Sequence, residues 1–225
     1  MFTHTQSSVT LTDLGLRWPD GETALSGISG SFGSGRTGLV GTNGSGKSTL
    51  LRLIAGQLVP TSGRIVTVGD VGYLPQTLTL RVDSTVADLL GISGTLSSLR
   101  AIESGDVSEH HFEVLGDDWD IETRADAVLR EIGLSAADLD RRVSQISGGE
   151  VMLVATAGLR LRRTAITLLD EPTNNLDRDA RSRLAGLVST WSGTLIVVSH
   201  DVSLLEQMDE TAELYGGELS VFGGP

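Results

Sequence analysis

The stretch Gly41-Thr42-Asn43-Gly44-Ser45-Gly46-Lys47-Ser48-Thr49 decides the fold of this 225-residue chain. It fits the pattern G-x-x-x-x-G-K-[ST] of a phosphate-binding loop at every fixed position. The glycines allow tight turns that aim successive backbone N–H groups at phosphate oxygens. Lys47 would bring a cation to the β- and γ-phosphates, and Ser48 would offer its hydroxyl to Mg²⁺. The stretch therefore predicts a nucleotide site.

The segments around the loop predict an α/β fold. Residues 38–40 have the character of a buried strand end, and residues 48–55 that of a helix whose N-terminus favours anions. Two further short apolar strands, at residues 165–169 and 194–198, each end at polar residues. Strands that alternate with helices around a phosphate loop imply a mostly parallel sheet covered on both faces.

Other segments predict local elements. Residues 64–68 and 71–74 are predicted to pair around Gly69-Asp70, and residues 212–215 and 218–222 to form a hairpin around Gly216-Gly217. From residue 83 to 139 the pattern is helical, with Ser84 as a candidate N-cap. We expect a single domain over residues 1–225, with an inserted helical subdomain at about residues 78–155.

Composition limits the class of protein. The chain is 39% hydrophobic, lacks cysteine, has no apolar run near the ~20 residues of a membrane span, and begins without a signal-peptide pattern in residues 1–8. These features favour a cytoplasmic location. The net charge of −12 argues against generic nucleic-acid or DNA binding through a basic face. Residues 103–126 hold nine acidic side chains against Arg124, which fits a solvated surface or, alternatively, a partner-facing patch.

Polar residues at predicted strand ends are candidates for chemistry. Asp170 is the expected acidic partner of Mg²⁺, and Glu171 is placed to act as a general base on water. Gln76 could meet Mg²⁺ or the attacking water, or be an ordinary loop residue. His200 could reach a γ-phosphate, although a histidine at a strand end is more often structural.

A second anion site is predicted at Ser147-Gly148-Gly149-Glu150, which opens a predicted helix. Free N–H groups at the helix start and the Ser147 hydroxyl could hold an anion. In isolation, the same residues also fit an ordinary Gly-Gly helix start.

In their order, these motifs resemble an ATP-binding cassette (ABC) domain over nearly the whole chain. Residues 41–49 match Walker A, Gln76 the Gln loop, residues 147–150 the signature, and residues 166–170 Walker B. Glu171, the Asp177 loop and the switch residue His200 complete the order. The resemblance implies a P-loop NTPase fold with a mostly parallel central sheet, an N-terminal antiparallel β subdomain and an inserted α-helical subdomain.

The resemblance also implies what the site does. Trp18 lies where the family stacks an aromatic ring on adenine, the alternative being a core or turn aromatic. Mg-ATP held by one cassette is closed over by the signature of a second cassette, from the same or another chain. The family hydrolyses that ATP with water aligned by the residues that match Glu171 and His200.

Three kinds of cassette protein remain to be distinguished. Glu171-Pro172-Thr173-Asn174-Asn175-Leu176-Asp177 resembles the EPTN-x-LD string of ABC-F proteins, tandem cassettes that act on ribosomes. The cassette motifs fit equally the nucleotide-binding subunit of a transporter, which pairs with membrane-spanning permease subunits. Chromosome-maintenance and DNA-repair ATPases insert a long coiled coil, whereas Ser147 follows Gln76 by only 71 positions here.

Two features depart from the ABC-F pattern. Val151-Met152-Leu153 stands where many members carry basic residues after the signature. The acidic residues 103–126 also suit contact with ribosomal RNA poorly, because phosphate binding favours Lys and Arg. The ABC-F interpretation remains the preferred one, with the transporter subunit as the alternative.

Overall fold

The computed structural model describes residues 7–81 and 83–223, which divide into two compact units. The first unit comprises the described residues up to 78, residues 164–174 and those from 188 onward. The second comprises residues 79–163, without residue 82, and residues 175–187. Most of the N-terminal stretch used for the signal-peptide prediction lies outside the described residues.

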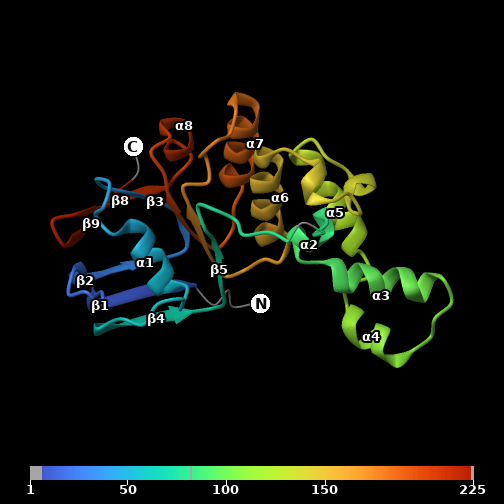
Figure 1. The fold of residues 1–225 in the computed structure, drawn as a ribbon, viewed down its shortest axis with the longest axis horizontal. Helices are drawn as coiled ribbons and strands as arrows, with labels where there is room; N and C mark the ends of the chain where they lie inside the picture. Colours follow the sequence, from blue (N-terminus) through green and yellow to red (C-terminus); the bar gives the residue numbers. More distant parts are fainter. Residues whose placement is uncertain (1–6, 82, 224–225) are drawn as a thin grey trace. The chain divides into compact units, whose positions relative to one another are not determined.

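A six-stranded sheet forms the centre of the first unit (Figure 1). Its strand order is β5-β6-β7-β3-β8-β9, and every neighbouring pair is parallel except β8 and β9. The strands are β3 (Gly35–Val40), β5 (Val71–Leu74), β6 (Ile166–Asp170), β7 (Thr194–Val198), β8 (Glu210–Tyr215) and β9 (Glu218–Gly223). The short helix α8 (Val202–Leu205) lies between β7 and β8 in the chain. The predicted parallel sheet and the hairpin at Gly216-Gly217 are confirmed.

A smaller antiparallel sheet belongs to the same unit. Its order is β2-β1-β4, from β1 (Ser8–Arg17), β2 (Thr23–Phe32) and β4 (Ser62–Val68). The predicted pairing of residues 64–68 with 71–74 is therefore wrong. β4 pairs with β1, whereas β5 pairs with β6 of the other sheet. The chain between β4 and β5 thus passes from one sheet to the other.

Helix α1 (Lys47–Ile54) packs against strands of both sheets. Its apolar residues Leu50 and Leu51 are fully buried, in one core with Leu39 of β3 and Ile196 of β7. Burial of a leucine side chain contributes about 2 kcal/mol to folding. Because this core holds the end of β3 and the start of α1, it fixes both ends of the loop at residues 41–46.

The second unit is helical among its described residues. It contains α2 (Val86–Leu90), α3 (Ser93–Glu103), α4 (Glu109–Leu115), α5 (Ile121–Glu131), the short 3₁₀ turns η1 (Ala136–Asp138) and η2 (Val143–Gln145), α6 (Gly148–Leu161) and most of α7 (Arg178–Ser189). Gly158 lets α6 approach α2 closely, because a Cβ atom there would lie 2.8 Å from Leu89 O. Within the described residues, no helix is long and apolar enough to span a bilayer.

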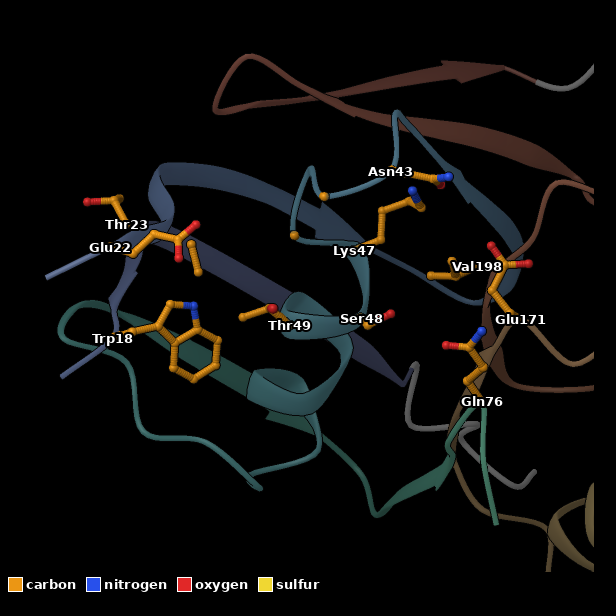
Figure 2. Close-up of a pocket in the computed structure, with 13 residues that line it drawn as sticks. Trp18, Glu22, Thr23, Asn43, Lys47, Ser48, Thr49, Gln76, Glu171 and Val198 are labelled. Carbon is orange, nitrogen blue, oxygen red and sulfur yellow. The ribbon is translucent and has the colours of Figure 1, made fainter. Parts of the chain in front are cut away.

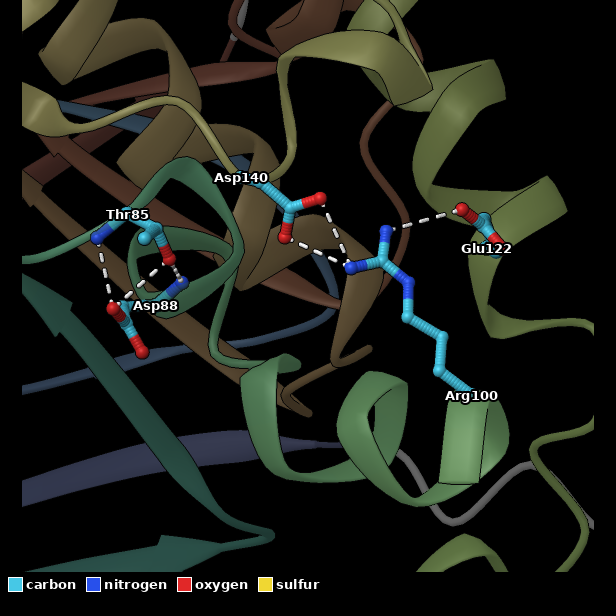
Figure 3. A network of polar contacts seen from close by, with 5 residues as sticks. All are labelled: Thr85, Asp88, Arg100, Glu122 and Asp140. Atoms are coloured by element: carbon cyan, nitrogen blue, oxygen red, sulfur yellow. Dashed lines mark hydrogen bonds and ion pairs between the residues drawn. The ribbon is translucent and has the colours of Figure 1, made fainter. Parts of the chain in front are cut away.

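Polar contacts tie the helices of this unit together (Figure 3). The Arg100 guanidinium donates to Asp140 at 2.8 Å and to Glu122 at 3.4 Å, which links α3 to α5 and to the turn after η1. Helix α2 is capped by Thr85, whose hydroxyl accepts from the Asp88 N–H at 3.2 Å. The predicted N-cap Ser84 is thus wrong by one residue, because Asp88 completes a reciprocal capping box with Thr85.

Candidate functional site

The loop at residues 41–49 needs glycine at two positions for steric reasons. Gly41 and Gly46 have φ values of 149° and 95°, in the region that favours glycine. A Cβ atom at Gly41 would lie 2.4 Å from Leu214 O, and one at Gly46 would lie 2.6 Å from Leu25 Cδ2. The backbone of the loop therefore lies against β8 and β2, and only glycine fits there.

Lys47 folds back onto this loop. Its ammonium donates to Gly41 O at 2.7 Å and to Thr42 O at 3.0 Å, and the residue is buried. The Ser45 hydroxyl oxygen is also buried, and among the described residues it has no hydrogen-bond partner. A buried cation and an unsatisfied hydroxyl on one glycine-rich turn suit an anionic ligand, which would accept from both.

Ser48 and Asp170 bring the loop and the end of β6 together. The Ser48 hydroxyl donates to Asp170 Oδ1 at 2.9 Å, and Asp170 is only 1% exposed. The two residues are far apart in sequence, but β3, β7 and β6 are successive strands of the parallel sheet. Their carboxyl ends therefore meet at the same edge, where ligands bind in open α/β sheets.

Glu171 adopts an uncommon backbone conformation, with φ at 49°. Its N–H donates to Val198 O at 2.8 Å, which holds the residue at the end of β7. Positive φ in a residue other than glycine costs about 1–2 kcal/mol and is common at functional sites. Burial raises the pKa of the Glu171 carboxyl above its ordinary value, while the charges of His200 and Lys47 oppose that rise. A raised carboxyl pKa makes Glu171 a better proton acceptor.

His200 and Gln76 lie near this carboxylate. His200 Nε2 is 3.2 Å from Glu171 Oε1; the His200 side chain is 54% exposed and that of Glu171 13%. Gln76 follows β5 and lines the same cavity as Glu171 (Figure 2). The structure thus brings both predicted residues to the end of the parallel sheet.

A cavity of about 460 Å³, which we call the loop cavity, runs beside α1. Figure 2 shows Trp18 at one end, Gln76 and Glu171 at the other, and Lys47 and Ser48 between them. Its lining is Trp18, Glu22, Thr23, Ala24, Asn43, Gly44, Gly46, Lys47, Ser48, Thr49, Gln76, Glu171 and Val198. This volume is within the range of small-molecule sites. Its elongated arrangement places an aromatic ring and a phosphate loop at different points along one cavity.

Some of these residues were missed by sequence reasoning, and some predicted residues lie just outside the lining. Glu22, Thr23, Ala24 and Val198 contribute to the cavity but carry no motif. The backbone N–H of Trp18 donates to Glu22 O at 2.8 Å, so a tight turn brings Glu22 beside the predicted aromatic. The predicted residues of the first unit that are outside the lining are Gly41, Thr42, Ser45, Asp170 and His200.

The residues at the loop fit a magnesium nucleotide. Mg²⁺ binds proteins through one or two oxygen ligands and takes its other ligands from phosphate and water. The Ser48 hydroxyl and the Asp170 carboxylate supply such a pair, 2.9 Å apart. Among the described residues no group of three or more His, Cys, Asp or Glu side chains could hold a metal without such help.

The predicted signature residues line a different cavity, in the second unit. This cavity, of about 460 Å³, is lined by Ser147, Gly148, Gly149, Glu150, Leu153, Asn175, Asp177, Asp179, Ala180 and Arg183. The Ser147 hydroxyl accepts from the Glu150 N–H at 3.2 Å, and the Glu150 carboxylate accepts from the Ser147 N–H at 2.7 Å. This reciprocal capping box confirms that α6 begins at the predicted Gly-Gly segment.

The parallel sheet, the glycine loop and the paired Ser48 and Asp170 define a P-loop nucleotide hydrolase. The family model described as ABC transporter matches residues 25–174. The chain belongs to the ABC transporter family and is an ATPase cassette of that family. The resemblance inferred from the motif order is confirmed at this level.

Three curated relatives show the range of proteins that contain similar cassettes. The tylosin resistance ATP-binding protein TlrC of Streptomyces fradiae is 34% identical over 94% of this chain and 43% of its own length. ABC transporter F family member 5 of Arabidopsis thaliana is 30% identical over 77% of this chain and 29% of its own length. The biotin transport ATP-binding protein BioM of Rhizobium etli is 29% identical over 82% of this chain and 80% of its own length. The chain thus spans less than half the length of the first two.

Solved cassette structures share the fold. A dimeric ATP-binding cassette, in a post-hydrolysis state bound to ADP and phosphate, is 22% identical and superimposes with a TM-score of 0.73. The match covers 96% of this chain and 98% of that one. The predicted fold class is therefore confirmed.

Proposed function

We propose that this cassette is one half of an ABC-F type protein that hydrolyses Mg-ATP and acts on ribosomes. The observation that carries the proposal is the Glu-Pro-Thr-Asn-Asn-Leu-Asp string that begins at Glu171. Two comparisons support it. One relative carries the F-family name, and TlrC is long enough to hold a second cassette beside the matched one.

The loop cavity would hold the nucleotide along its length. Trp18 would stack on the base, and the N–H groups of residues 41–49 would hold the phosphates together with Lys47. Ser48 and Asp170 would hold Mg²⁺, with Gln76 as a further oxygen ligand. Bound Mg²⁺ would neutralise charge on the phosphate oxygens.

The chain's own residues would then prepare water for attack on the γ-phosphate. The Glu171 carboxylate would accept a proton from that water, since burial raises its pKa and leaves it basic. His200 would orient the carboxylate from 3.2 Å and stabilise negative charge on the phosphate. Thus Glu171 and His200 would be the catalytic pair.

A second cassette would complete the site. The signature at Ser147, Gly148, Gly149 and Glu150 lines a cavity of its own and would close over the nucleotide of a partner cassette. The partner would be a second cassette of the same protein or another copy. We further propose that residues 1–225 form one cassette, with a helical subdomain inserted at about residues 78–155, and that the protein is cytoplasmic.

One observation favours a second candidate, the ATP-binding subunit of a membrane transporter. The match to the biotin transport protein covers most of that protein's length, as expected if a single cassette forms the whole subunit. In that case the partners would be membrane-spanning permease subunits.

Sedimentation with ribosomes distinguishes the two candidates. The Glu171→Gln variant is mixed with purified ribosomes and ATP, and centrifuged through a sucrose cushion. We expect it to sediment with ribosomes in ATP and not in ADP, because ATP without hydrolysis holds the cassettes closed. Lys47→Ala is the control, and it should stay in the supernatant in both nucleotides.

Equal sedimentation of both variants would contradict the ABC-F proposal. ATP-dependent recovery with detergent-solubilised membrane proteins, and none with ribosomes, would favour the transporter subunit.

A further inference from the structure

A tyrosine that belongs to no motif contacts the buried aspartate of the site. The Tyr73 hydroxyl donates to Asp170 Oδ2 at 3.1 Å, while the Ser48 hydroxyl donates to Oδ1 at 2.9 Å. The two carboxylate oxygens of Asp170 are thus held separately, one by the phosphate loop and one by β5.

The register of the sheet explains why Tyr73 reaches this position. β5 and β6 are parallel, and Tyr73 stands opposite Leu168. Residues 168 and 170 lie on the same face of β6, because side chains alternate along a strand. The long Tyr73 side chain extends from its position beside Leu168 to Asp170, in the direction of the phosphate loop.

Burial makes this contact important. Asp170 is only 1% exposed, so bulk solvent does not reach its second oxygen. An unsatisfied buried carboxylate oxygen costs more than a single ordinary hydrogen bond contributes. A tyrosine phenol is protonated near neutral pH, so the Tyr73 hydroxyl is the donor of this hydrogen bond.

We infer that Tyr73 is a positioning residue for the magnesium site, which holds Oδ2 of Asp170 so that Oδ1 is presented beside Ser48. This inference rests on the proposed role of Asp170 and Ser48 in holding Mg²⁺. Strand β5 would then contribute to the Mg²⁺ affinity of the site through Tyr73, in addition to leading into the segment that contains Gln76. Partners of this kind, which bind a metal ligand rather than the metal, commonly change metal affinity 10- to 100-fold when removed.

The test compares nucleotide affinity with and without metal in the Tyr73→Phe variant. The dissociation constant of ADP is measured by calorimetry in EDTA, and then over a titration with Mg²⁺. We expect ADP to bind Tyr73→Phe in EDTA as it binds the wild type. In Tyr73→Phe, the Mg²⁺ concentration that gives half of the maximal increase in ADP affinity should rise about 10-fold, because Asp170 loses the hydrogen bond from the Tyr73 hydroxyl.

The matched control is Tyr215→Phe. The chain contains only two tyrosines, and Tyr215 is 66% exposed on the hairpin between β8 and β9. This variant should retain the wild-type response to Mg²⁺. An unchanged Mg²⁺ response in Tyr73→Phe would overturn the inference. If Mg²⁺ does not change the ADP affinity of the wild type, the result would instead overturn the proposal that Ser48 and Asp170 hold Mg²⁺.

A second measurement avoids dependence on the folding of Tyr73→Phe. With 3-fluorotyrosine incorporated into Tyr215→Phe, the single ¹⁹F signal reports on Tyr73. We expect the ¹⁹F signal of Tyr73 to shift when Mg²⁺ is added to the ADP complex. The Asp170 carboxylate, which Tyr73 contacts, would then bind Mg²⁺. A signal that does not move while ADP binding tightens would also contradict the inference.

Discussion

Glu171 Oε1 lies 3.2 Å from His200 Nε2, and these residues follow the adjacent parallel strands β6 and β7. The contact joins a carboxylate whose pKa is raised by burial to a group whose charge lowers that pKa. Burial thus raises the pKa of Glu171, and the charges of His200 and Lys47 lower it. The contribution of His200 can be removed by a single substitution.

Glu171→Gln should still bind ATP but hydrolyse it about 10²- to 10⁴-fold more slowly, because the amide cannot accept the proton of water. Steady-state phosphate release and ATP titration measure the two properties separately. Lys47→Ala should instead lose nucleotide binding. Hydrolysis at the wild-type rate by Glu171→Gln would remove this residue as the general base.

His200→Ala should raise the pKa of Glu171 further in the nucleotide-free and metal-free protein. The charge of His200 lowers that pKa in the wild type, so its loss leaves burial less opposed. The side-chain carboxyl of ¹³C-labelled glutamate, followed by NMR over a pH series, reports this value. His110→Ala, in the other unit, should leave the Glu171 titration unchanged, and a fall in the pKa in His200→Ala would contradict the interpretation.

Trp18→Ala should weaken ADP binding about 5- to 150-fold, the loss expected for about 1–3 kcal/mol of base stacking. Trp18→Phe should retain most of the affinity because it keeps an aromatic face. Trp119→Ala is the matched control, since Trp119 is exposed in the second unit. Trp18 also packs against the core, so its loss could lower stability as well as nucleotide affinity. The melting temperatures of Trp18→Ala and the wild type must therefore be compared in the absence of nucleotide. Equal ADP affinity in Trp18→Ala and wild type would exclude stacking.

Gly46→Ala should destabilise the protein by about 3 kcal/mol and abolish ADP binding. The new Cβ atom would meet Leu25 Cδ2 at 2.6 Å and Ala24 O at 3.0 Å, in addition to the strain of a positive φ. Gly44→Ala separates the two effects. Gly44 also has positive φ, at 81°, but no described atom outside its own neighbourhood lies within 4 Å of such a Cβ. Gly44→Ala should lower the free energy of unfolding by about 1 kcal/mol. Urea unfolding measures this free energy for both variants.

Asp209→Asn should cost about 1 kcal/mol of stability at pH 7, the upper value for a partly exposed ion pair. Asp209 accepts from the side chain and the backbone N–H of Arg36, and this lowers the pKa of Asp209. A lowered folded-state pKa gives stability above the unfolded value of about 4, which is lost as the pH falls through the folded value.

The urea midpoints of wild type and Asp209→Asn should therefore differ at pH 7 and converge in acid. Asp83→Asn is the control, because its pair with Arg81 is long and highly exposed. A difference that grows as the pH falls below about 4 would contradict this assignment.

Local patterns predicted those parts of the fold in which the interacting residues are near in sequence. The hairpin at Gly216-Gly217 and the cap at Ser147 depend on residues a few positions apart, and the phosphate loop between β3 and α1 is identified by a motif of nine consecutive residues. Their geometry follows from glycine conformations and capping hydrogen bonds, so the sequence was sufficient.

The failed prediction at Gly69-Asp70 has a long-range cause. The dipeptide has the composition of a hairpin turn, but the Asp70 carboxylate accepts from the N–H of Ala165 at 2.9 Å. Ile166 also donates its N–H to Asp70 O at 2.9 Å. Contacts with a segment almost one hundred residues away direct β5 into the other sheet. No local pattern contains that partner.

The unpredicted site residues have the same origin. Glu22 and Thr23 enter the loop cavity because β2 lies beside the loop, and Tyr73 reaches Asp170 because of strand register. Motif spacing identified the residues with charged or nucleophilic groups. It did not identify residues that tertiary packing brings beside them.

The two hydrogen bonds that Lys47 donates to backbone carbonyls have a consequence for the cycle of nucleotide binding and release. Without them, departure of a nucleotide would leave the ammonium of Lys47, a residue only 7% exposed, without a hydrogen-bond acceptor in a low-dielectric site. Gly41 O and Thr42 O compensate that charge from within the loop. Product release is therefore an exchange of ligands at one nitrogen atom, and the emptied loop is already held in shape for the next nucleotide.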